Sequence, residues 1–126
     1  MKKGFLFAVI AIVASFTSFA NPVAVLEDNA EHYTQTENGY IVNFDLQATS
    51  DEYLDVTRRA EENSRLLTLT AVEDGINNYH CVLTINHQNH PEYVHKMMVA
   101  LGITTLLYKE ATHPIIYIVD ILKSYE

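Results

Sequence analysis

The sequence has one cysteine, no tryptophan, four glycines and only eight lysines and arginines against sixteen aspartates and glutamates. Because Cys81 is alone, no disulfide can form within the chain, which excludes the small domains held by a disulfide framework. The shortage of basic residues removes the positive surface that nucleic-acid binding requires. The chain also has no glycine-rich phosphate loop, no nucleophile elbow and no His-Glu-x-x-His. We therefore expect neither an enzyme nor a nucleic-acid partner.

The first twenty residues, MKKGFLFAVIAIVASFTSFA, have the three parts of a secretory signal peptide: a basic start, an apolar stretch and a small-x-small ending. The apolar stretch is broken at Ser15 and Thr17, whereas a membrane-spanning helix needs about 20 apolar residues. We expect cleavage after residue 20, export to the periplasm or the medium, and no membrane attachment afterwards; an uncleaved anchor is the alternative. Without Lys2 and Lys3, six basic residues face sixteen acidic ones, a net charge of −10.

Residues 21–126 have the length of one domain. Residues 21–39 are polar and acidic with no clean period, which predicts a linker, although VAVL at 23–26 is compatible with a short edge strand. From residue 40 to 109 the pattern indicates strand, helix, strand, strand, helix and strand. The strands alternate with a period of two. One helix begins at Thr49 or Ser50 as its N-cap, and the other begins near Pro91 and ends at Gly102.

This order of elements predicts an α+β fold, a ferredoxin-like βαββαβ two-layer sandwich over residues 40–109, with an antiparallel sheet and both helices on one face. We expect its first and third strands to lie side by side and parallel, so that the loops leading into the two helices meet at one edge. The apolar tail, residues 110–126, fits a helix capped by Thr112 better than a fifth strand. In either form it should pack on the domain or on a partner.

The stretch NHQNHPEYVH, residues 86–95, is the candidate for a metal site. His87 and His90 have His-x-x-His spacing, and the predicted topology brings them close to Asp51. Imidazole nitrogens suit zinc or copper, whereas two helix N-termini favour an anion. A tight metal site needs three or four protein ligands, and only two histidines are close in the sequence here. We therefore expect no cofactor, with a zinc or copper site at His87, His90 and Asp51 as the hypothesis to test.

The order of elements and the stretch VHKMMVALGITTLLY, residues 94–108, resemble the second half of a heavy-metal-associated domain, the small copper-chaperone module. The resemblance implies metal binding through a Cys-x-x-Cys in the first strand-to-helix loop. In this chain that loop reads Gln47-Ala48-Thr49-Ser50, so the family's thiolate ligands have no counterpart.

The sequence thus favours an exported, non-catalytic domain that binds another protein or forms a homo-oligomer. Exposed edge strands would accept an added strand, and the apolar tail offers a second surface. One alternative is a periplasmic metal-ion or anion binder that uses His87 and His90. Another is a protease-inhibitor or propeptide-like module, because YIVNF at 40–44 is similar to the first strand of protease propeptides, which share the predicted topology.

Overall fold

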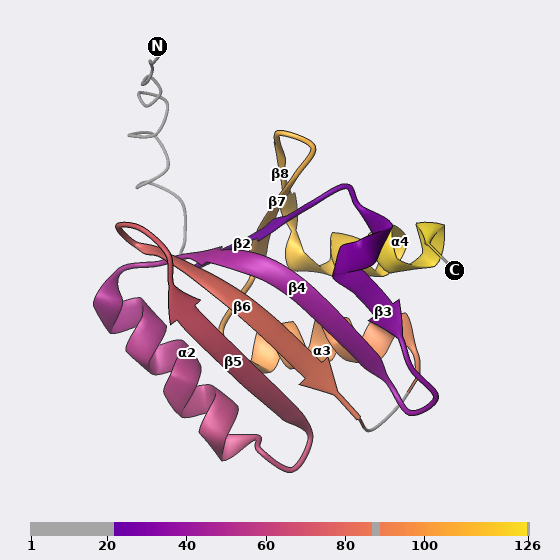
Figure 1. The fold of residues 1–126 in the computed structure, drawn as a ribbon, viewed down its shortest axis with the longest axis horizontal. Helices are drawn as coiled ribbons and strands as arrows, with labels where there is room; N and C mark the ends of the chain where they lie inside the picture. Colours follow the sequence, from indigo (N-terminus) through magenta and orange to yellow (C-terminus); the bar gives the residue numbers. More distant parts are fainter. Residues whose placement is uncertain (1–21, 87–88, 126) are drawn as a thin grey trace.

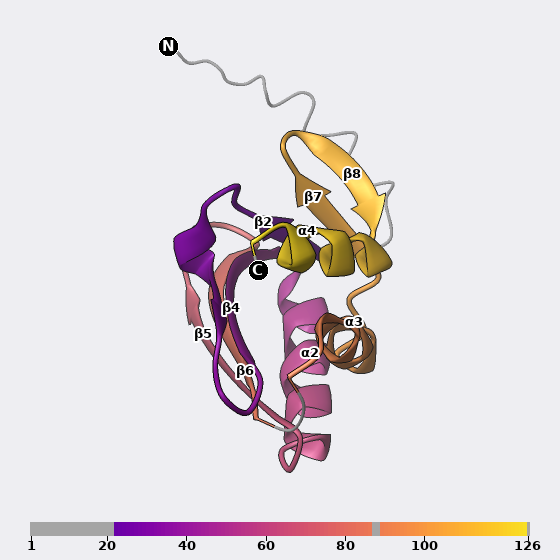
Figure 2. The same cartoon turned by 90° about the vertical axis from the view of Figure 1, so that its right-hand side faces the viewer.

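The computed structural model describes residues 22–86 and 89–125, so the predicted signal peptide lies outside the described residues. The described chain forms a seven-stranded sheet with helices packed on one of its faces (Figures 1 and 2). The strands are β2 (Val23–Leu26), β3 (Tyr33–Gln35), β4 (Tyr40–Gln47), β5 (Leu67–Glu73), β6 (Asn78–Ile85), β7 (Thr105–Tyr108) and β8 (Ala111–Pro114). The helices are α2 (Ser50–Glu62), α3 (Pro91–Ala100) and α4 (Ile118–Ser124), with 3-10 turns at Ala30–His32 and Ile115–Tyr117.

The sheet does not have the predicted ferredoxin-like topology. Its strand order is β5-β6-β4-β2-β7-β8, and β3 pairs with β4 beside β2. Strand β2 lies antiparallel to β4 and parallel to β7, which makes the sheet mixed. The segment 21–39, expected to be a linker, therefore contributes two strands. The strand at 23–26, which the sequence allowed only as an edge strand, lies inside the sheet between β4 and β7. Val23, Ala24 and Leu26 are all buried there, so no alternation of apolar and polar residues marks it.

The predicted parallel pairing of the first and third strands of residues 40–109 is also wrong. These strands are β4 and β6, and they run antiparallel, with Tyr40 opposite Ile85 and Gln47 opposite Asn78. The end of β4 therefore lies next to the start of β6. This direction decides which loops come together at the candidate metal site.

Local signals in the sequence correspond to the observed element ends. The Thr49 hydroxyl accepts the Glu52 N–H at 3.2 Å and the Glu52 carboxylate accepts the Thr49 N–H at 2.8 Å, a capping box that starts α2. Pro91 opens α3, as predicted. At its end Gly102, with φ +85°, donates its N–H to the Val99 carbonyl at 2.9 Å. Ile103 donates to Met98 at 3.0 Å, which completes a Schellman motif.

The tail contains a short strand followed by a helix. Ala111–Pro114 is strand β8, which pairs with β7 across a turn at Lys109 and Glu110. The helix then begins after the turn at Ile115–Tyr117 rather than at Thr112, because Pro114 itself is extended, with ψ 151°. Helix α4 packs against α3 and buries four apolar residues, Ile118, Val119, Ile121 and Leu122. In the part of the chain that the structure describes, no helix combines the length and the apolar character needed to cross a bilayer.

Candidate functional site

Asp51 does not lie beside the histidine-rich stretch. It is in the first turn of α2, and the Ala48 N–H just before that helix donates to the Asn77 carbonyl at 3.1 Å. At the opposite end of β4, Gln35 donates from its amide to the Asn89 side chain at 2.6 Å. The eight residues of β4 separate the two ends by about 23 Å, at roughly 3.3 Å per residue step. The expected approach of Asp51 to His90 is therefore wrong.

His90 caps α3 through its backbone, is exposed, and makes no side-chain capping bond. His87 lies outside the described residues, so the pairing of His87 with His90 stays a prediction. Within residues 22–86 and 89–125, no group of three or more histidine, cysteine, aspartate or glutamate side chains is placed to hold a metal. Two other histidines have protein partners: His80 Nδ1 lies 2.9 Å from the Asp45 carboxylate, and the His113 ring stacks on Tyr117.

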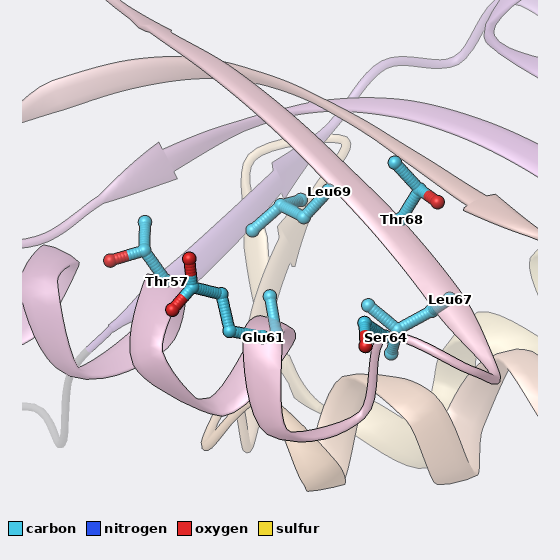
Figure 3. A pocket seen from close by; sticks show the side chains of 7 residues that line it. Thr57, Glu61, Ser64, Leu67, Thr68 and Leu69 are labelled. Atoms are coloured by element: carbon cyan, nitrogen blue, oxygen red, sulfur yellow. The ribbon is translucent and has the colours of Figure 1, made fainter.

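A pocket of about 250 Å³ lies between α2 and β5 (Figure 3). The side chains that line it come from the second half of the helix, the turn after it and the start of the strand: Thr57, Ala60, Glu61, Ser64, Leu67, Thr68 and Leu69. The sequence showed α2 and β5 separately as an amphipathic helix and an alternating strand. It did not show the pocket, because the pocket depends on where the helix crosses the edge of the sheet.

Helix α2 lies beside the outer edge of β5 rather than over the middle of the sheet (Figure 1), and it is on the same face as α3 (Figure 2). Its inner side is fixed by buried Val56 and Ala60 and by Tyr53, whose ring stacks on Tyr79 with centroids 3.8 Å apart. The helix therefore extends past the last strand of the sheet. We call this projecting part of α2 the overhang. The pocket is the space between the overhang and the outer edge of β5.

The Glu61 carboxylate supplies the charge of the pocket. Glu61 is exposed and has no ion pair among the described residues. Both basic residues of α2 are already engaged: Arg58 pairs with Asp55 and, at 2.8 Å, with Glu62, while Arg59 pairs with Asp55 at 2.9 Å. Arg65, in the turn after the helix, makes no ion pair with Glu61. Glu61 therefore faces the pocket as an uncompensated negative charge.

The backbone of β5 has one side without a partner strand. Asp74 donates its N–H to the Asn78 carbonyl at 2.8 Å, and bonded and non-bonded pairs alternate along an antiparallel ladder. In this register Thr68, Thr70 and Val72 bond to β6. Among the alternate residues, the N–H and C=O groups of Leu69 and Ala71 point to the open edge, whereas the Leu67 N–H already donates to the Asn63 carbonyl at 3.1 Å. These groups are available to another strand.

Three large apolar side chains are exposed near the far end of β5 and on α2. Val72 and Ile76 are 69% and 93% exposed, and Leu54 on α2 is 61% exposed. Leu54 precedes Thr57 by three residues and Glu61 by seven, so all three lie on the side of the helix that faces the β5 edge. Val72 alternates with Ala71 along β5, so its side chain points to the face of the sheet opposite α2.

No family model matches the chain, and no curated protein or solved structure matches it. The resemblance to heavy-metal-associated domains therefore stays a prediction, and the groove between α2 and β5 is the site that the geometry itself offers.

Proposed function

We propose that the protein is a small exported binding domain that captures an extended segment of another protein as an added strand on β5. The observation that carries the proposal is the open edge of β5, where the backbone groups of Leu69 and Ala71 point away from β6. An added strand would satisfy these groups, and pockets for its alternate side chains would give specificity. Export follows from the predicted signal peptide.

A non-catalytic role agrees with the character of the groove. Its polar groups are one carboxylate and three hydroxyls, from Glu61, Thr57, Ser64 and Thr68, with no histidine or cysteine beside them. The thiol of Cys81 lies in the core, where burial raises its pKa to about 12. A thiol with such a pKa stays protonated at neutral pH, so Cys81 supplies no nucleophile.

The test is a selection of random linear peptides on immobilised residues 21–126, followed by calorimetry of the selected peptides on two proline variants. Ala71→Pro removes an N–H at the open edge of β5 and leaves the bonds to β6 intact. Thr112→Pro is the matched control at the other edge of the sheet. The two-residue turn at Lys109 and Glu110 makes Tyr108–Ala111 a bonded pair, so the Thr112 N–H points away from β7.

We expect Ala71→Pro to lower the affinity of the selected peptides at least tenfold and Thr112→Pro to leave that affinity unchanged. Circular dichroism of both variants shows whether the fold is retained. If no peptide is selected, or if the selected peptides bind Ala71→Pro as well as the parent, the proposal is wrong.

A further inference from the structure

We propose that the captured segment is recognised by a lysine or arginine side chain that enters the pocket between α2 and β5 and pairs with Glu61. This inference rests on the proposed function, since it names the chemistry of the segment that β5 captures. The partner is accordingly a protein with an extended segment that carries a basic residue.

The pocket lies where one side chain of an added strand has to go. Side chains directly opposite one another in neighbouring strands project to the same face of the sheet. A residue opposite Leu69 therefore points to the face that α2 and α3 cover. Because α2 extends past β5, that side chain would enter the space lined by Leu67, Leu69, Ala60 and Glu61.

The lining of the pocket matches the two parts of a long basic side chain. Ala60, Leu67 and Leu69 offer apolar contact, and Glu61 with the hydroxyls of its neighbours offers acceptors. Lysine and arginine bury an aliphatic stem and keep a charged group in water, so they use both parts. An acidic side chain would instead face the carboxylate of Glu61, which Arg58 and Arg59 do not neutralise.

A second copy of the chain fits the groove poorly. Its β5 would bring a second α2 into the space that the first α2 already covers. If the two copies of β5 paired antiparallel over their seven residues, Glu73 of one would lie opposite Leu67 of the other, next to Glu61. Two chains with a net charge of −10 also repel each other. The occupant is therefore a strand without a covering helix, from a partner of opposite charge.

The experiment compares peptides selected on the parent protein with peptides selected on Glu61→Lys. We expect the parent to select sequences that share a lysine or arginine at one position. Replacing that residue with glutamate should lower affinity at least tenfold for the parent and raise it for Glu61→Lys. Glu62→Lys is the control: it makes the same change in net charge, but Glu62 is turned by about 100° around the helix and is bonded to Arg58.

The outcomes separate this inference from the proposed function. If selected peptides depend on the β5 edge, as Ala71→Pro reports, but show no basic preference, the assignment of the pocket is overturned and strand capture stands. The same holds if Glu61→Lys and Glu62→Lys change selectivity equally. If no selected peptide responds to Ala71→Pro, both proposals are wrong.

Discussion

The chemistry of Cys81 is set by its place on the inner face of β6. The side chain is fully buried, and desolvation, with a smaller effect from Asp45, raises the pKa of the thiol to about 12. Because only the thiolate reacts with disulfide reagents, we expect the native protein to be inert to such a reagent at pH 8 and to react with one equivalent once unfolded in urea. Absorbance of the released thiol measures this. Rapid labelling of the native protein would contradict the burial of Cys81.

Gly39 is required for space, not for an unusual backbone angle. A Cβ at this position would lie 1.8 Å from the Ile85 carbonyl oxygen, which belongs to the backbone of β6 and cannot move aside. We expect Gly39→Ala to lower the free energy of unfolding by about 3 kcal/mol, measured by urea denaturation. Gly75→Ala is the control. A Cβ at this position would meet no atom within 4 Å, but the backbone has φ +101°, so Gly75→Ala should lower the free energy of unfolding by about 1 kcal/mol. Equal losses would show that β6 can shift.

At the scale of elements, α4 is tied to the sheet by tyrosine hydroxyls around Asp28. Tyr125 and Tyr108 donate to the same carboxylate oxygen of Asp28 at 2.6 and 3.0 Å, and Lys109 Nζ lies 3.5 Å from the other oxygen. The Tyr125 ring also stacks on Tyr33 with centroids 5.1 Å apart. These hydrogen bonds, Tyr125 first, hold the pKa of Asp28 below its usual range. The last turn of the chain is thereby joined to the loop after β2.

This arrangement makes the docking of α4 sensitive to acid. Since the pKa of Asp28 is lowered on folding, its stabilising contribution is complete above the unfolded pKa of about 3.9 and is lost as pH falls through the lower folded value. We expect Asp28→Asn to have a lower Tm than the parent at pH 7 and the gap to close toward pH 2. Asp120→Asn, on the exposed side of α4, is the control. A gap that stays constant with pH would show that the carboxylate charge does not hold α4.

The sequence predicted the individual elements of residues 40–108 well, because their signals are local. In β4 the alternation of apolar and polar residues corresponds to buried Tyr40, Val42, Phe44 and Leu46 between half-buried neighbours. The start of α2 and the end of α3 were marked by Thr49 and Gly102, whose capping bonds need only residues within the same turn. The late start of α4 was missed because Pro114 suits an extended residue as well as a first helical turn.

At the scale of the whole molecule, the order and direction of the strands could not be read from the sequence. Alternation shows that a strand has one buried face, but it is the same for parallel and antiparallel neighbours. The expected approach of Asp51 to His90 was wrong at this point, since it requires β4 and β6 to run parallel, whereas the pairing of His87 with His90 stays a prediction. The pocket below α2 was missed for a related reason. It exists because the helix extends past the sheet, which no spacing of residues within α2 or β5 records.

The same overhang leads to a prediction about the oligomeric state. An exposed sheet edge normally invites pairing with a second copy. Here the α2 of a second copy would collide with the first α2 at the β5 edge, and the opposite edge is the four-residue strand β8, which ends in Pro114. We therefore expect residues 21–126 to be monomeric by sedimentation equilibrium at physiological ionic strength.

Measurements at two salt concentrations distinguish the two expected causes of the monomeric state, which are repulsion between acidic chains and the position of α2. Raising the ionic strength to about 1 M shortens the screening length to about 3 Å and suppresses repulsion between acidic chains, but it leaves the overhang of α2 in place. If the protein stays monomeric under both conditions, the position of α2 prevents two copies from pairing, and the β5 edge accepts only a strand that no helix covers. A dimer that forms in high salt and is abolished by Ala71→Pro would show that repulsion alone keeps the β5 edges apart. The captured strand could then come from a second copy of the chain, which is the result that would overturn the assignment of a basic partner.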